Sequence, residues 1–141
     1  PAYVKALDEA VVVLMIEKRQ CVEDLDAILA VPGIDIVPFG GSDYSMSIGQ
    51  VGNRAHADVR NAERQTIATA LKLGIQPRVE IAEPEQAAPY LEMGVKHFCI
   101  GWDVGILSNF WRSRGEVMQG LLGDKPAMAK GKAGEVADLY R

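Results

Sequence analysis

The chain has 141 residues, of which 48% are hydrophobic and 24% charged, which is enough apolar material for one globular domain and too little for two. Fifteen basic against 19 acidic residues give a net charge of -4, so the sequence lacks the basic excess of proteins that bind nucleic acid or anionic membranes. No apolar run approaches the ~20 residues needed to cross a bilayer, and no signal-peptide pattern is present. We therefore expect a cytoplasmic protein with neither nucleic-acid nor membrane partners.

Short apolar runs alternate with longer helical patterns along the chain, as in repeated strand–helix units. The first run, residues 11–16, has no polar residue on either face, which predicts a strand of a parallel sheet that is covered on both sides. A helical pattern follows over residues 22–29, and a Pro-Gly pair ends it. Residues 34–39 are the second predicted strand.

Residues 40–49 are polar and rich in glycine, so we expect a loop that is too long for a tight turn and not helical throughout. A helix is predicted for residues 58–73, and Gly74 stops it. The third strand is predicted at 77–81. The next helix begins at a Glu-Pro pair, and Pro89 is expected to distort it.

The fourth strand is predicted at residues 96–101 and is followed by an amphipathic helix that ends near residue 122. We divide the chain into a half-barrel domain at 1–123 and a charged tail or partner-docking helix at 124–141. Four strand–helix units are half of a closed (β/α)8 barrel, which takes ~250 residues. An open doubly wound sheet is the alternative, but its GxGxxG turn is missing after the first strand. The sequence thus predicts an α/β fold, a partial (β/α)8 TIM-type barrel.

Acidic residues stand at the C-terminal ends of the predicted strands, where parallel α/β folds gather their functional groups. Glu17 and Asp43 follow neighbouring strands, which lie about 4.8 Å apart, so their carboxylates can converge on one hard divalent cation such as Mg2+ or Mn2+. The alternative is that Glu17 pairs with Lys18 or Arg19 while Asp43 caps a turn. Metal binding and ordinary surface pairing both remain open at this point.

Other polar residues are weaker candidates. Glu80 is expected to pair with Arg78, and Asp103 to cap the helix after it. The backbone of residues 40–42 offers N–H groups to an anion, or is simply a flexible connection. The two histidines, His56 and His97, lie away from the acidic residues and are poor general bases. The two cysteines, Cys21 and Cys99, lack metal-site spacing and are expected to be inert core thiols.

Several blocks of sequence carry a family resemblance. They are Met-Ile-Glu-Lys-Arg at 15–19, the helical block at 22–28, Phe-Gly-Gly-Ser-Asp-Tyr-Ser-Met-Ser-Ile-Gly at 39–49, and Gly-Trp-Asp at 101–103. Together they resemble the C-terminal half of the HpcH/HpaI aldolase family, in order from about residue 11 to residue 107. The resemblance implies a phosphoenolpyruvate/pyruvate-type barrel and class II aldolase chemistry, that is, a carbon–carbon lyase acting on 2-keto acids.

The resemblance also implies roles for particular residues. Glu17 and Asp43 would hold the divalent metal ion, Mg2+ or Mn2+, and Gly41, Ser42 and Asp43 would bind pyruvate. The family's catalytic histidine and substrate-binding arginine belong to the N-terminal half and have no counterpart here, so no catalytic residue is identified. Gly41 and Tyr44 replace a frequent proline and leucine, and Trp102 replaces a small residue, which points to a different substrate preference.

Two functions follow from these observations. In the first, the chain is the metal-binding half of an aldolase whose substrates are pyruvate, or another 2-keto acid, and an aldehyde. In the second, it is a noncatalytic half-barrel or an assembly module. Four strands leave two open edges, so we expect a homo-oligomer or a complementary N-terminal half as the partner.

Overall fold

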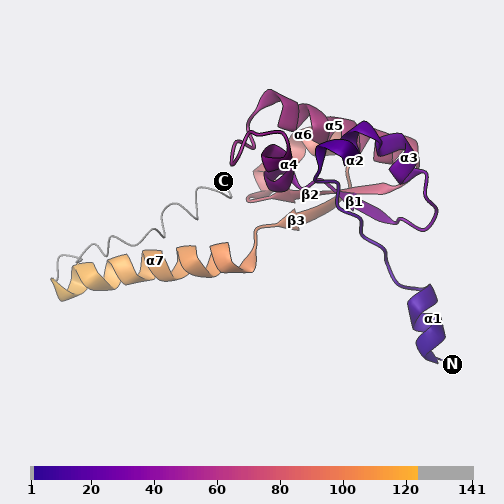
Figure 1. The fold of residues 1–141 in the computed structure, drawn as a ribbon. Helices are drawn as coiled ribbons and strands as arrows, with labels where there is room; N and C mark the ends of the chain where they lie inside the picture. The colour runs from indigo at the N-terminus through magenta and orange to yellow at the C-terminus, as the bar shows by residue number, and fades with distance from the viewer. Residues whose placement is uncertain (1, 124–141) are drawn as a thin grey trace.

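The computed structural model describes residues 2–123, and these residues form a small parallel sheet with helices on one face (Figure 1). The strands are β1 (Ile36–Pro38), β2 (Gln76–Ile81) and β3 (His97–Ile100), in the order β1-β2-β3. Both pairings are parallel, with Pro38 opposite Arg78 and Glu80 opposite Cys99. The expected α/β class is confirmed.

Residues 11–16 run parallel to β1 as an extended segment with isolated bridges, Val13 to Ile36 and Ile16 to Phe39. The N–H of Ile16 donates to the carbonyl of Pro38 at 3.0 Å, so the register continues to the end of β1. The prediction that both faces of this run are covered is wrong for the described residues. Ile16 is buried, but Val13 is 45% and Met15 40% exposed.

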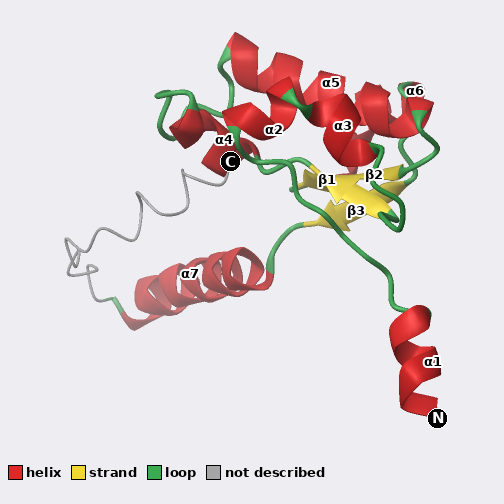
Figure 2. Cartoon of the chain, turned by 45° about the vertical axis from the view of Figure 1, so that its right-hand side comes forward, coloured by secondary structure: helices red, strands yellow, loops and turns green. Residues whose placement is uncertain are grey.

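The helices account for most of the described chain. They are α1 (Ala2–Asp8), α2 (Arg19–Glu23), α3 (Leu25–Leu29), α4 (Gly41–Ser47), α5 (Ala57–Lys72), the 3-10 turn η1 (Pro84–Ala87), α6 (Ala88–Glu92) and α7 (Asp103–Leu122). Helices α2 to α6 lie on one side of the sheet (Figure 2). In the part of the chain that the structure describes, no helix is long and apolar enough to span a membrane.

Two clusters of buried side chains fill the space between the sheet and this helical layer. One contains Ile16, Leu25 and Val37, and the other contains Ile67 and Val79. Both clusters include residues of α5, which therefore joins the two halves of the core. Burial of these apolar side chains stabilises the packing of the helical layer against the sheet.

The opposite face of the sheet and two terminal helices lie outside this core. Cys99 is exposed on the uncovered face, so the expectation of a core thiol is wrong for it, whereas Cys21 packs beside the first cluster. Neither α1 nor α7 has a buried residue. Figures 1 and 2 both show α7 running away from the rest of the molecule.

Local structure departs from expectation at two places, residues 40–49 and 22–29. The segment at 40–49 is not a loop, because α4 occupies most of it. The helix predicted at 22–29 is broken at Asp24 into α2 and α3. The expected disturbance near Pro89 is confirmed, since the chain forms η1 and then a new helix with Pro89 in its first turn. The tail predicted at 124–141 lies outside the described residues.

Candidate active site

Glu17 lies at the C-terminal end of the extended segment, beside Gly40. The N–H of Gly40 donates to the carbonyl of Ile16 at 2.9 Å, which fixes the two backbones next to each other. A Cβ atom placed on Gly40 would lie 2.7 Å from Glu17 Cβ and 3.0 Å from Glu17 Oε2. Because real side-chain atoms do not approach so closely, glycine at position 40 leaves the space that the Glu17 carboxylate occupies.

Asp43 lies in the first turn of α4, three residues after Gly40. The helix is anchored by Tyr44 and Ser45, which are both buried, and the Tyr44 ring packs against Phe39 with centroids 5.2 Å apart. Glu17 therefore lies against Gly40 from the neighbouring segment, and Asp43 follows Gly40 by three residues in the chain. Both side chains are half-buried.

No ion pair or side-chain hydrogen bond joins either carboxylate to another described residue. Within residues 2–123, Glu17 makes no ion pair with Lys18 or Arg19, and Asp43 accepts no capping hydrogen bond. A divalent cation would supply the partner that these carboxylates lack among the described residues. The described residues contain no group of three or more acidic, histidine or cysteine side chains that could hold a metal ion. The described part of the chain therefore offers no third protein ligand beside these two carboxylates.

The pair is a chemically suitable donor set for Mg2+ or Mn2+, since both ions prefer oxygen ligands and commonly keep several coordination positions for water and substrate. The absence of a side chain at Gly40 is the structural feature compatible with a metal site, because it leaves room for the Glu17 carboxylate. It lets the Glu17 carboxylate lie against the backbone that leads into α4.

Gly41 and Ser42 begin α4. Gly41 is buried, and the carbonyl of Ser42 accepts a hydrogen bond of 2.7 Å from the hydroxyl of Ser45. The N–H groups of a helix's first turn have no acceptor within the helix. Those of residues 41–43 can therefore donate hydrogen bonds to the carboxylate oxygen atoms of a bound acid.

The remaining sequence candidates have local partners. Arg78 Nη2 lies 3.7 Å from Glu80 Oε1, as expected, although Arg78 Nε is buried without a hydrogen-bond partner. Asp103 is the first residue of α7, and its carboxylate accepts the N–H of Val104 at 2.8 Å. His56 caps α5 by accepting the N–H of Asp58, which agrees with its exclusion as a general base.

Sequence reasoning missed a groove of about 830 Å3 beside this site. It is lined by Gly41 and Arg54 on one side, by Glu63 and Tyr90 on the helices, and by Trp102 at the start of α7. The Tyr90 hydroxyl donates to Glu63 Oε1 at 3.3 Å. Burial raises the pKa of Glu63, and burial together with the Glu63 charge raises that of Tyr90.

Glu63 could have been recognised from the sequence. It shares one face of α5 with Val59, Thr66, Ile67 and Ala70, which are buried, so a carboxylate there interrupts an apolar stripe. Nothing in the sequence pairs it with Tyr90, which comes from a different helix.

Comparison with known proteins gives a consistent picture. A family model described as HpcH/HpaI aldolase/citrate lyase matches residues 4–109. A 4-hydroxy-2-oxo-heptane-1,7-dioate aldolase from Shigella sonnei (strain Ss046) is 36% identical over 104 residues, which cover 74% of this chain and 40% of that protein. The protein of the same name from Klebsiella pneumoniae subsp. pneumoniae is 33% identical over 109 residues, 77% of this chain and 41% of its own.

Solved structures are similar over most of the described chain. The crystal structure of an HpcH/HpaI aldolase from Desulfitobacterium hafniense DCB-2 has a TM-score of 0.76 at 27% identity and covers 87% of this chain and 48% of that one. The citrate synthase SbnG has a TM-score of 0.76 at 25% identity, over 88% of this chain and 50% of its own. The chain therefore spans less than half the length of the curated relatives it matches, and it belongs to the HpcH/HpaI aldolase/citrate lyase family.

Proposed function

We propose that this chain supplies the metal-binding half of an aldolase that cleaves or forms 2-keto-acid aldols through a pyruvate enolate. The observation that carries the proposal is the pair of half-buried, unpartnered carboxylates, Glu17 and Asp43, placed around Gly40. Family membership supports the reaction class, a carbon–carbon lyase.

Glu17 and Asp43 would hold a divalent cation, Mg2+ or Mn2+. Such an ion supplies Lewis-acid stabilisation of the negative charge that develops on the oxygen atoms of the keto acid. The protein's own contribution is to keep both carboxylates at one edge of the sheet, where the space at Gly40 receives the Glu17 side chain.

The first turn of α4 would bind the acid end of the substrate. The N–H groups of Gly41, Ser42 and Asp43 can donate to a carboxylate, and they orient it beside the two acidic side chains. The name of the Shigella relative describes a 2-keto acid with a carboxylate at each end. We propose pyruvate or a related 2-keto acid, together with an aldehyde, as the substrates here.

Complete turnover needs groups that the described residues do not place at this site, namely a general base and an arginine for the substrate. We propose that these come from a complementary N-terminal half or from a further copy in a homo-oligomer. The uncovered sheet face, with Val13 and Met15 exposed, is where such a partner would complete a barrel.

The test measures Mn2+ binding to the chain by water-proton relaxation, and then Mn2+-dependent exchange of the pyruvate methyl protons with the complementary half added. We expect the Glu17→Gln, Asp43→Asn double variant to lose at least tenfold in Mn2+ affinity and to lose exchange. The matched control, Glu23→Gln with Asp24→Asn, makes the same chemical change at exposed positions and should change neither. Unchanged Mn2+ affinity in the first variant would rule out the assignment.

A second candidate is a noncatalytic half-barrel or assembly module. It is favoured by the uncovered sheet face and by α7, on which no residue is buried. Self-association without Mn2+ binding or pyruvate exchange, even with the complementary half present, is the result that would select it.

A further inference from the structure

Ser47, at the end of α4, forms a hydrogen-bond bridge between two parts of the candidate metal site. Its hydroxyl oxygen accepts a hydrogen bond of 3.0 Å from the N–H of Arg19, and the hydroxyl donates to the carbonyl of Tyr44 at 2.8 Å. Arg19 follows Glu17 by two residues, and Tyr44 comes directly after Asp43. One side chain therefore connects the backbone near the first carboxylate with the backbone beside the second.

A second hydrogen bond joins the same two segments at their other end. The N–H of Gly40 donates to the carbonyl of Ile16 at 2.9 Å. Among the described residues, no hydrogen bond besides these two connects residues 16–19 with residues 40–47. The two bonds close a ring that contains both acidic residues of the candidate site. The relative position of the carboxylates therefore depends on two hydrogen bonds, and Ser47 supplies one of them.

The bond to Ser47 takes the place of a cap that α2 lacks. Lys18 precedes the first residue of α2, and its side chain makes no capping hydrogen bond. A helix leaves the N–H groups of its first turn without an internal acceptor. At Arg19 a hydroxyl from a different helix satisfies this N–H. The bond thus attaches the end of the segment that carries Glu17 to α4.

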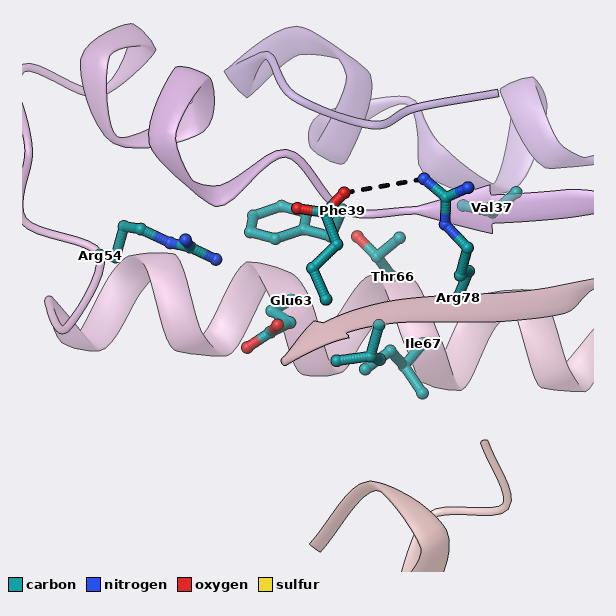
Figure 3. A pocket seen from close by; sticks show the side chains of 9 residues that line it. Val37, Phe39, Arg54, Glu63, Thr66, Ile67 and Arg78 are labelled. Atoms are coloured by element: carbon teal, nitrogen blue, oxygen red, sulfur yellow. Dashed lines mark ion pairs between the residues drawn. The ribbon is translucent and has the colours of Figure 1, made fainter. Parts of the chain in front are cut away.

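The role of Ser47 differs from that of the buried residues of α4. The buried Tyr44 ring lies 5.2 Å from the ring of Phe39. Phe39 in turn lines a small cavity together with Val37 and Thr66 (Figure 3). Packing of this kind fixes the middle of the helix against the sheet. Ser47 is only half-buried, so it acts on the site mainly through its hydrogen bonds.

Binding of one cation by two carboxylates depends on how accurately the protein holds them. Mg2+ requires near-ideal octahedral geometry, so displacement of one ligand weakens binding. Hydrogen bonds that orient metal ligands typically change metal affinity by about ten- to a hundredfold. The described residues offer no third protein ligand that could compensate for a displaced carboxylate.

We propose that Ser47 is a positioning residue for the divalent cation, whose hydroxyl holds Glu17 and Asp43 at the separation that lets both bind the ion. The assignment rests on the proposed function, because those two residues are its metal ligands. Ser47 does not touch the ion itself. Loss of its hydroxyl should weaken cation binding more than it weakens the fold, because the exposed N–H of Arg19 can then bond to water.

The experiment measures Mn2+ affinity by water-proton relaxation, the melting temperature by calorimetry, and amide exchange of the Arg19 N–H by NMR. We expect Ser47→Ala to weaken Mn2+ binding about tenfold and to speed exchange at Arg19. Ser45→Ala is the matched comparison, since buried Ser45 donates to the Ser42 carbonyl within α4 and makes no bridge. It should lower the melting temperature more than Ser47→Ala does and weaken Mn2+ binding less. Ser47→Thr keeps the hydroxyl and should restore the affinity to within about twofold.

A second variant removes the donor of the bridge and leaves α4 unchanged. Arg19→Pro takes away the N–H at the first position of α2, where proline is tolerated, and the extended backbone of Lys18 suits a residue before proline. We expect it to weaken Mn2+ binding as much as Ser47→Ala does. Arg19→Gln is its control, because it removes only a positive charge and should not weaken cation binding. Arg19→Pro decides the question if Ser47→Ala does not fold.

Mn2+ affinity that stays within about twofold of the unchanged chain in Ser47→Ala or Arg19→Pro would overturn the positioning role. Equal weakening by Ser45→Ala would overturn it as well, because general loosening of α4 would then explain the effect. In either case the metal site itself stands if Glu17→Gln with Asp43→Asn loses Mn2+ binding. If that double variant keeps its affinity, the proposed function fails and the role of Ser47 fails with it.

Discussion

Gly40 is the residue on which the geometry of the acidic pair depends. An alanine there would bring Cβ to 2.7 Å from Glu17 Cβ, so the Glu17 side chain or the backbone beside it must move. We expect Gly40→Ala to lower the free energy of unfolding by about 1–3 kcal/mol and to weaken Mn2+ binding about tenfold. Denaturant unfolding and water-proton relaxation measure the two effects.

Gly115, in α7, provides the matched substitution, because a Cβ there meets nothing within 4 Å. Gly115→Ala should leave Mn2+ affinity unchanged and should favour the helix by roughly 0.5–1 kcal/mol. If Gly40→Ala also left Mn2+ affinity unchanged, the space at Gly40 would have no part in metal binding.

Glu63 gives the molecule a pH dependence whose sign follows from its burial. Burial raises the pKa of this carboxyl, so the ionised form is less favourable in the folded chain than in the unfolded one. Its contribution to stability is complete below the ordinary carboxyl pKa of about 4.3 and is lost as the pH rises through the raised value. Glu63→Gln should therefore raise the melting temperature at pH 8 by about 2–4 °C, and by much less at pH 4.

Calorimetry at both pH values checks this prediction, with exposed Glu92→Gln as the control. Glutamine still offers an oxygen to the Tyr90 hydroxyl, so the hydrogen bond between α5 and α6 can persist. A Glu63→Gln variant that is less stable at pH 8 than the unchanged chain would show that the charge itself holds the structure together.

At this scale the sequence singles out the acidic pair as candidates but not Arg54, which lines the groove beside Gly41. Glu17 and Asp43 are candidates because Glu17 ends one apolar run, Asp43 follows the next, and both lie in blocks that resemble a family. Arg54 stands in a connection with no periodicity, and its direction depends on how that connection packs against Gly41. Such a contact is tertiary, so no local pattern reports it.

Among the elements, α4 shows how packing can override local composition. Its glycines and small polar residues predict a loop. In the structure, Ser45 and Ser47 donate to the carbonyls three residues earlier, at 2.7 and 2.8 Å, and Tyr44 is buried. The hydroxyls are satisfied inside the helix, so contacts made by its buried face decide the outcome. By contrast, α5 and β2 were predicted within one residue at each end, because their apolar periodicity is long and regular.

Helix α7 presents an apolar surface without a covering element in the described chain. Leu107 is 56% and Phe110 48% exposed, and the Phe110 ring packs edge-on against Trp111, with the Arg114 guanidinium over it, both from the same helix. We expect α7 to mediate self-association, so Leu107→Ser with Phe110→Ser should reduce it at least tenfold without lowering the melting temperature. Sedimentation velocity measures the first effect, and Arg112→Ser is the control on the same helix.

For the whole molecule, the uncovered face of the sheet is the main departure from expectation. A continuous apolar run indicates that a strand is buried on both sides, but it does not say which segment covers each side. Here the helices cover one face, and Val13, Met15 and Cys99 remain exposed on the other or at its edge. The positions of β1, β2 and β3 and their parallel pairing could be predicted. The sequence could not show that no described element covers the second face of the sheet.

The complementary half proposed above should bind this face. Adding it is expected to slow amide hydrogen exchange along residues 11–16 at least tenfold and to raise the melting temperature of the chain. Exchange that stays as fast as in the chain alone would show that a different surface is used.

The position of α7 outside the core bears on which substitutions the helix tolerates. No side chain of α7 enters either core cluster, and the backbone bond from the N–H of Gly101 to the carbonyl of Ile81 completes the sheet before the helix begins. We therefore expect substitutions in the second half of α7, beyond the residues that line the groove, to leave the folding of the sheet and its helical layer unchanged. On the proposal that α7 mediates self-association, quaternary structure can evolve there independently of the sheet edge that carries Glu17 and Asp43.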